Sequence, residues 1–499
     1  MIPTLPPELL HQIFQKLQMS DLKRLRSTCK RFNAVATPFV FSSMKIDTDS
    51  SQFRKYSSIL KAIASGRSDV ARHVQTLTIL SLTPPRYKRL KLWQRIMKRK
   101  QRVYRAFEND FLRAITKFEA VTSLYFDIHT NQPSSADKIM QSLGALPRLS
   151  KLSVHMYHDV DPSVSLSLSR HFKNLSSIHL CGLRLCYNDA PSIIIANSPE
   201  LTELTLDGTS ELKSDKAATM ENLFSKLPTG TTLPLQSLTI GGTMRYLLDP
   251  APQIPPHFKS LTSLVITSDT ISVPADFWRA LETARIYLQK LSVRELDEPL
   301  LSYLESYAGL KDLSAGRFDD DVAKSDLAAD RFYHCVVPKH SGSLRNVRVN
   351  TDFEGKWCLG DTQLDEIMRC SGLVSLDVSV GLGEVDAPYD ENVITRLLEG
   401  VASGVFPLLR YIAVSFANPR SVRSIADPII LMYAPHGVHG HRRINDIVSE
   451  FQCVKPNSCM LALEMSTGHM HNSRLVKSEA DFWSFKLMAR DGSYYEFPY

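Results

Sequence analysis

Histidines and cysteines gather near the end of the sequence, where imidazole and thiolate groups could bind zinc. His436, His439 and His441 stand in the segment APHGVHGH, and further potential ligands follow at Cys453, Cys459, His469 and His471. The spacings match no familiar zinc finger, and a glycine-rich surface loop with solvated histidines also explains this composition. We therefore expect no metal site, with zinc binding as the alternative.

No catalytic motif is evident in the chain. It lacks a Gly-x-Ser-x-Gly elbow, a glycine-rich phosphate loop and a His-Glu-x-x-His zinc helix. We expect a protein that is not an enzyme, with no catalytic residue and no cofactor. Its function should then depend on binding.

The strongest charge feature is the segment 86–105, which holds ten Lys or Arg and no acidic residue. Without it, the formal net charge falls from +7 to −3. Leu90, Trp93, Ile96, Met97 and Val103 alternate with the basic residues, which is typical of a basic amphipathic helix. We predict a solvated helical insertion; the alternatives are a nuclear-import signal, a site for an acidic partner, or a nucleic-acid or lipid contact.

Composition indicates a folded protein with a sizeable core. Of the 499 residues, 43% are hydrophobic and 22% charged, and no apolar run approaches the length of a membrane span. The N-terminus lacks a basic start followed by an apolar stretch, so we expect no signal peptide. Eight scattered cysteines without a Cys-x-x-Cys pair suggest reduced thiols. We expect a cytoplasmic or nuclear protein with no membrane partner.

The N-terminus predicts three short helices that need a partner. Pro6 and Pro7 fix the entry to a helix, and Glu8 places negative charge on its first turn. Apolar residues then recur at helical spacing, at Leu9, Leu10, Ile13, Phe14 and Leu17. Three helices in about 40 residues cannot bury so many large side chains among themselves. Another surface must therefore cover some of them, either a partner or the rest of this chain.

These residues resemble the F-box, the module that links a substrate receptor to an SCF-type ubiquitin ligase. The similarity lies in LPPELL at 5–10, in Ile13, Phe14 and Leu17, and in Asp21-Leu22, Leu25, Cys29-Lys30-Arg31-Phe32 and Pro38. The chain departs from the family at Thr28, usually apolar, and at Phe32 and Phe41, often tryptophan. The resemblance implies an adaptor-binding surface made of Leu5, Pro6, Leu9, Leu10, Ile13, Phe14, Leu17, Leu25 and Phe32.

A second pattern, Leu-x-x-Leu-x-Val/Leu/Ile, repeats through most of the chain. Eleven copies, 22 to 36 residues apart, begin at Val121, Leu149, Leu175, Leu201, Leu235, Leu261, Leu288, Leu310, Leu344, Leu373 and Leu409, and Val74 begins a twelfth. The alternating end of each copy predicts a strand, and the segments between copies predict helices. One strand and one helix bury too little alone, so the units must stack.

This pattern resembles the leucine-rich repeats attached to many F-box proteins, although it lacks their asparagine ladder. The predicted fold is mixed α/β: a short three-helix F-box, an irregular repeat solenoid and a C-terminal cap with a terminal hairpin. The expected boundaries are 1–46 for the F-box, 47–120 for a linker with a first repeat and the basic insertion, 121–419 for the solenoid and 420–499 for the cap. The alternative is an α/β domain with unrelated leucine-rich strands.

The residues that flank the last two apolar positions of each copy should point away from the core and cover the concave sheet. We expect substrate binding there, at Tyr125, His155, His179, Asp207, Arg294, Arg348 and Asp377, with the loops or the cap as the alternative. The resemblance then implies a non-catalytic receptor that binds an adaptor, through it a cullin scaffold, and a target protein. Other readings are a scaffold outside the ligase and, less expected, a nucleic-acid-binding repeat protein that uses 86–105.

Overall fold

The computed structural model describes residues 5–48, 53–82, 94–128, 136–156, 162–183, 189–208, 220–242, 256–267, 273–316, 321–422, 435–453, 457, 463–467, 472–477 and 483–488. The chain divides into two compact units, and each is described by itself. Unit 1 comprises residues 1–247 and 255–258, and unit 2 comprises 248–254 and 259–499.

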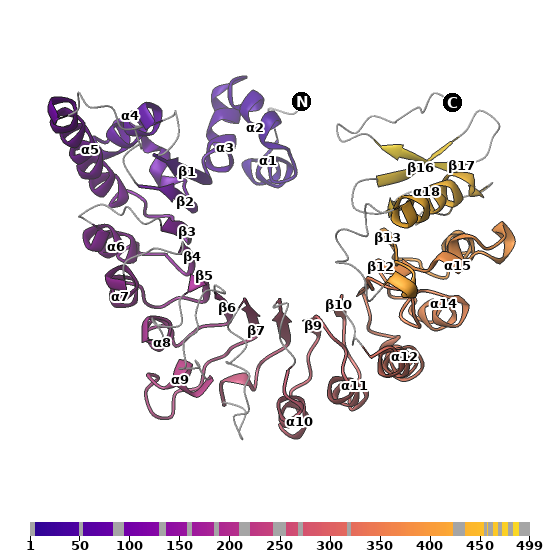
Figure 1. Cartoon of the computed structure of the whole chain (residues 1–499). Helices are drawn as coiled ribbons and strands as arrows, with labels where there is room; N and C mark the ends of the chain where they lie inside the picture. Colours follow the sequence, from indigo (N-terminus) through magenta and orange to yellow (C-terminus); the bar gives the residue numbers. More distant parts are fainter. Residues whose placement is uncertain are drawn as a thin grey trace. The chain divides into compact units, whose positions relative to one another are not determined.

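Unit 1 begins with three short helices, which we call the N-terminal module (residues 5–42). They are α1 (Pro7–Phe14), α2 (Met19–Arg26) and α3 (Lys30–Val40) (Figure 1). Proline occupies the first turn of α1, where its missing N–H costs no hydrogen bond. The Cys29 thiol accepts a hydrogen bond from the Phe32 N–H at the start of α3, so a side chain caps that helix.

The rest of unit 1 is a parallel sheet with helices between its strands. Each strand pairs in parallel with the next. The strands are β1 (Ser43–Asp47), β2 (Thr76–Ser81), β3 (Ser123–Ile128), β4 (Lys151–Met156), β5 (Ser177–Leu183), β6 (Glu203–Gly208) and β7 (Ser237–Gly241). The helices are α4 (Phe53–Ala64), η2 (Asp69–Arg72), α5 (Gln94–Ile115), α6 (Ala136–Gly144), α7 (Pro162–His171), α8 (Asp189–Ala196), α9 (Met220–Phe224) and η5 (Pro256–Phe258).

Unit 2 continues the same strand-and-helix pattern. Its parallel strands are β8 (Ser263–Ile266), β9 (Lys290–Val293), β10 (Asp312–Ala315), β11 (Asn346–Val349), β12 (Ser375–Val380), β13 (Tyr411–Phe416) and β15 (Glu464–Thr467). The elements between them are α10 (Ala275–Thr283), α11 (Glu298–Glu305), α12 (Val322–Arg331), η6 (Phe332–Val336), α13 (Val337–His340), α14 (Asp361–Met368), α15 (Leu382–Val385), η7 (Tyr389–Glu391), α16 (Val393–Ala402), η8 (Arg420–Val422) and α18 (Pro435–Glu450). Three antiparallel strands close the unit: β16 (Asn472–Lys477), β17 (Trp483–Met488) and β14 (Gln452–Cys453).

The predicted fold class is confirmed: N-terminal helices precede a long series of parallel-strand repeats. Register explains why the repeats stack. Leu152 lies opposite Leu124 on β3 and Ile178 on β5, and all three are buried. Each copy thus adds one layer of apolar side chains between sheet and helices, and burial of such a side chain stabilises the fold by about 1.5–3 kcal/mol.

Three repeats satisfy the same backbone group with different side chains, each from a segment downstream of the motif. The backbone N–H of the first motif residue donates to Ser198 Oγ from Leu175, to the Tyr303 hydroxyl from Leu288 and to His340 Nδ1 from Leu310, at 3.1–3.2 Å. These N–H groups are buried and need an acceptor. Serine, tyrosine and histidine can each accept this hydrogen bond, so the sequence of the repeats can vary at the positions that supply the acceptor.

The described end of the basic segment leads into a packed helix. Helix α5 runs on to Ile115, and its buried Phe107 and Phe111 pack toward α4, where the Phe53 and Phe107 rings lie 5.2 Å apart. The part of α5 after residue 105 therefore packs in the repeat between β2 and β3, while the solvated insertion at 86–105 stays a prediction. Leu90 and Trp93 lie outside the described residues, as do the side chains of 94–102.

The C-terminal prediction was partly wrong. The histidine-rich segment that we expected to be a loop forms the start of α18. The parallel sheet also extends past residue 420, because β15 pairs with β13. A terminal hairpin exists between β16 and β17, upstream of the expected turn at 490–492, which lies outside the described residues.

Candidate functional site: an exposed apolar pair and two polar sheet faces

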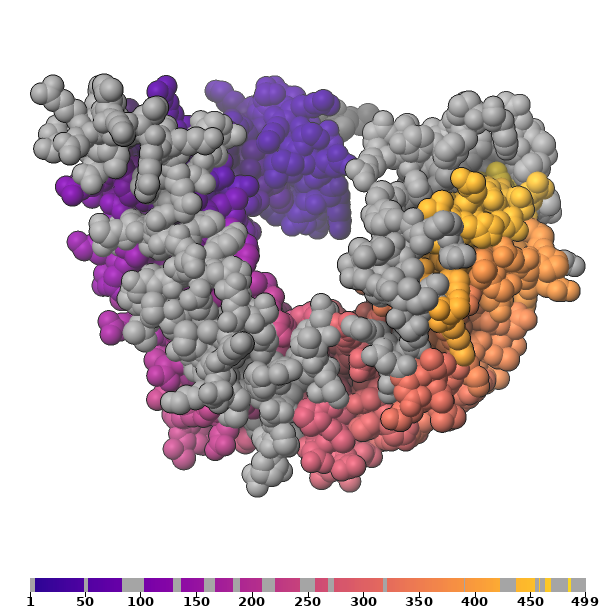
Figure 2. All heavy atoms as spheres, viewed as in Figure 1, coloured from indigo at the N-terminus to yellow at the C-terminus, as the bar shows by residue number. Residues whose placement is uncertain are grey.

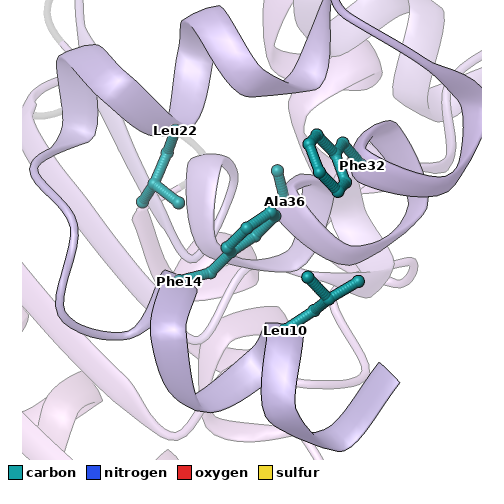
Figure 3. Packing of buried hydrophobic residues seen from close by; sticks show 5 residues of the cluster. All are labelled: Leu10, Phe14, Leu22, Phe32 and Ala36. Carbon is teal, nitrogen blue, oxygen red and sulfur yellow. The ribbon is translucent and has the colours of Figure 1, made fainter. Parts of the chain in front are cut away.

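The N-terminal module has a small core of its own. Leu10, Phe14, Leu22, Phe32 and Ala36 pack together from all three helices (Figure 3). Each is at most 8% exposed, and the rings of Phe14 and Phe32 meet edge to face at 5.6 Å. This core fixes the orientation of α1, and so determines which of its side chains remain outside.

Two large apolar side chains of α1 remain at the surface. Leu9 and Ile13 are each 44% exposed and lie one helical turn apart. Met19, at the start of α2, is 43% exposed. Exposed apolar side chains one turn apart on a helix of so small a module, such as Leu9 and Ile13, are typical of a protein-binding surface.

The nine residues predicted to bind an adaptor divide into three groups. Leu10, Phe14 and Phe32 form the module's own core, so their contribution to binding would be indirect. Leu5, Leu17 and Leu25 are partly buried against that core. Pro6, Leu9 and Ile13 are exposed and available to a partner. The prediction omitted the exposed Met19. Its position at the start of a helix, just before Ser20 and Asp21, was the signal that could have identified it as a surface residue.

Four of the predicted substrate-binding residues share one face of unit 1, which we call the unit 1 polar face. Tyr125, Ser153, His179 and Thr205 lie in register across β3–β6, and Asp127, His155, Cys181 and Asp207 form the next row. His155 Nδ1 lies 3.7 Å from Asp127 Oδ1, and the Cys181 thiol donates to Asp207 Oδ2 at 3.7 Å. Asp127 and Cys181 were missed, although each stands two residues after a predicted position on its own strand.

The electrostatics of this face suit binding better than catalysis. Burial, and then the nearby Asp207 carboxylate, raise the pKa of Cys181 to about 11, so the thiol remains protonated at neutral pH. Burial lowers the pKa of His179, which keeps that imidazole neutral. A nucleophilic cysteine needs the opposite environment, one that stabilises its thiolate.

Unit 2 brings two of its three predicted residues together. Arg348 on β11 lies opposite Asp377 on β12, and its Nε donates to Asp377 Oδ2 at 2.7 Å. The arginine side chain is 60% exposed while the aspartate is nearly buried, so Arg348 is held in place and still reaches solvent. Arg294 directly follows β9, two strands away from Arg348.

The described residues contain neither a candidate metal site nor a membrane-spanning helix. Among the described residues, no group of three or more His, Cys, Asp or Glu side chains could hold a metal ion. His439 of the histidine-rich segment instead lies 3.2 Å from Asp386 Oδ1, while Cys459, His469 and His471 fall outside the described residues. No helix in the described part of the chain is long and apolar enough to cross a membrane.

Comparison with known proteins identifies the N-terminal module. Residues 2–44 match the family model described as F-box-like. No curated protein matches the chain. Among solved structures, a chain from the crystal structure of the Rad7 and Elc1 complex in yeast is similar, with 14% identity and a TM-score of 0.38 over 81% of this chain and 85% of that one.

Proposed function

We propose that this chain, whose residues 2–44 form an F-box-like domain, is a non-catalytic substrate receptor of an SCF-type ubiquitin ligase. One observation carries the proposal: within that domain, Leu9 and Ile13 stay exposed although the neighbouring Leu10 and Phe14 are buried. An adaptor subunit would cover this apolar pair and connect the chain to a cullin scaffold. We place this activity in the cytoplasm or the nucleus.

The repeats would supply the target-binding surface. The unit 1 polar face offers Tyr125, His179 and Asp207, and unit 2 offers Arg294 and Arg348. Repeat sheets of this kind present extended surfaces, and Tyr and Arg are frequent binding anchors. The chain would then act by proximity, because holding a target near the ubiquitin-charged enzyme raises the effective concentration of a lysine there.

The adaptor contact can be tested with a double substitution. Leu9→Asp and Ile13→Asp together should weaken binding of the purified adaptor at least 100-fold, or about 2.7 kcal/mol, because both charges would be desolvated in the interface. Isothermal titration calorimetry measures this change. The matched control is Gln12→Ala with Lys16→Ala, two exposed residues beside the apolar pair, and it should bind as the unaltered chain does.

Circular dichroism must show that the double variant still folds, which is expected because neither residue belongs to the module's core. Undiminished adaptor binding by the folded variant would refute the docking surface. Adaptor binding without recruitment of the cullin would instead favour a scaffold that works outside the ligase.

A further inference from the structure

A groove on the N-terminal module carries positive charge that no described residue neutralises through an ion pair. It measures about 700 Å³ and lies between α2, the start of α3 and Phe41. Lys23, Arg26 and Lys30 line it. From Leu22 to Met44 the sequence has five basic residues and no acidic one, so this is a second basic region besides 86–105.

The polar groups of this groove are arranged as hydrogen-bond donors. Arg26 is held over the Phe41 ring, 4.7 Å from its centroid, which leaves its N–H groups at the rim. Asn33 uses its carbonyl oxygen to accept from the Thr37 hydroxyl, so its amide N–H groups remain available. Two lysine ammonium groups add further donors. Such a set favours an anionic ligand.

No carboxylate of the described residues lines the groove. Lys23, Arg26 and Lys30 form no ion pair within the part of the chain that the structure describes, although such pairs occur in both units, as between His171 and Asp137 and between Arg331 and Glu305. The three side chains repel one another weakly, and the module would gain stability from an added negative partner.

We propose that this basic groove binds an acidic segment of the adaptor, a second contact beside the apolar pair. The inference rests on the proposed function. Charge supports it, because three basic side chains line the groove, and the exposed apolar Met19 lies one turn from Lys23 on α2. The open form of the groove favours a chain segment over a small anion, and its basic residues come from two helices, Lys23 and Arg26 from α2 and Lys30 from α3.

The test uses the full-length chain and the purified adaptor at several salt concentrations. Charge reversal of the groove (Lys23→Glu, Arg26→Glu, Lys30→Glu) should weaken adaptor binding at least tenfold and flatten its salt dependence. The matched control (Lys16→Glu, Arg24→Glu, Lys45→Glu) changes net charge equally at exposed positions outside the groove and should cost less than threefold. Equal losses in both variants would overturn the proposal.

Carbodiimide cross-linking of the unaltered complex gives an answer that does not depend on a variant's folding. It joins a lysine ammonium to a carboxylate in contact with it, so mass spectrometry should find Lys23 and Lys30, and not Lys16, linked to adaptor Asp or Glu residues. A complex without links at Lys23 and Lys30 would refute the groove contact while the docking surface stands.

If the adaptor does not bind at all, the proposed function fails, and a separate probe still decides about the groove. A labelled (Glu-Gly)₄ peptide should bind the unaltered chain more tightly than it binds the groove variant, and a (Gln-Gly)₄ peptide should bind neither. The same binding is then measured with millimolar inorganic phosphate and with chloride at the same ionic strength. If phosphate abolishes binding of the glutamate peptide and chloride does not, the groove is a phosphate site and the acidic-segment assignment is overturned.

Discussion

The N-terminal module and the repeat sheets expose opposite kinds of side chain. On α1, Leu9 and Ile13 stay in solvent because the buried Leu10 and Phe14 already fill the module's core. On the unit 1 polar face, the outward positions hold Tyr125, His179 and other polar residues, while the inward ones are buried leucines and isoleucines. The module thus exposes two large apolar side chains of α1, whereas the sheet face of unit 1 exposes mainly polar ones.

The two regions should differ in how well they tolerate substitutions. Replacing a polar residue on a sheet face alters recognition with little cost in stability, because surface substitutions usually change it by less than about 0.5 kcal/mol. The module has less freedom, since its buried core residues alternate along α1 with the exposed pair Leu9 and Ile13. A receptor could thus change its target while retaining its adaptor. Three experiments probe this contrast.

The largest effect should come from the core of the module. Phe14→Ala removes a side chain that is 2% exposed and contacts the Phe32 ring, and should destabilise the module by about 3–5 kcal/mol. Hydrogen exchange of α1–α3 should then rise sharply, and adaptor binding should be lost with it. Leu9→Ala is the control, because it removes an exposed side chain of the same helix and should leave exchange unchanged. Equal exchange in the two variants would remove the distinction between core and docking residues.

Substitutions on the sheet face of unit 2 should weaken target capture and leave folding unchanged. Arg294→Ala with Arg348→Ala should weaken capture of a target identified by affinity purification by about 2 kcal/mol, with folding and adaptor binding intact. The Arg348–Asp377 pair is mostly solvated on the arginine side, so its loss should cost at most about 1 kcal/mol of stability. The matched control is Arg279→Ala with Arg369→Ala. Both arginines are exposed and belong to unit 2, but Arg279 lies on α10 and Arg369 at the end of α14, away from the sheet strands. Full capture by the sheet variant would move the target site to the loops or the cap.

Most strands could be predicted because two-residue alternation survives even in irregular repeats, as in Leu152 and Val154. Strands β1 and β15 were missed, because Met44 and Ile46 follow the module without a leading leucine, and Met465 and Thr467 depart from the motif. Helix α18 was predicted as a loop because of its glycines. A side chain at Gly440 would overlap the Phe416 ring, so glycine is needed there for packing against β13, and local sequence does not show this.

The apolar stripe of α1 was predictable as a set, but not which of its residues are buried. Helical spacing placed Leu9, Leu10, Ile13 and Phe14 together, yet it could not tell which pair faces the core, since both pairs are apolar and one turn apart. The packing of α3 against α1 decides it, through Phe32 and Ala36. The basic groove was missed for a related reason: its lysines and arginine come from two helices and meet only in the folded module.

The smallest effect should be a difference in acid stability between the repeats and the module. His340 is buried, and its Nδ1 accepts from the Leu310 N–H while Nε2 lies 3.0 Å from the Leu304 carbonyl oxygen, so the neutral ring is fully hydrogen-bonded. Burial lowers the pKa of His340 below that of a histidine in the unfolded chain, about 6.5. The unfolded state therefore binds the additional proton below about pH 6.5, and the contribution of this histidine to stability, complete above that pH, is lost as the pH falls toward the folded-state pKa.

Urea unfolding followed by tryptophan fluorescence measures this loss in unit 2, which holds Trp278, Trp357 and Trp483 of the chain's four tryptophans. The free energy of unfolding should fall between pH 7 and pH 5.5, and His340→Gln should be less stable at pH 7 but should flatten the decline. His334→Gln is the control, because that histidine is exposed. The described residues of the module contain one histidine, the exposed His11, so hydrogen exchange of α1–α3 should show no matching loss. Parallel losses in module and repeats, or an unchanged decline in His340→Gln, would show that this buried histidine does not set the acid response.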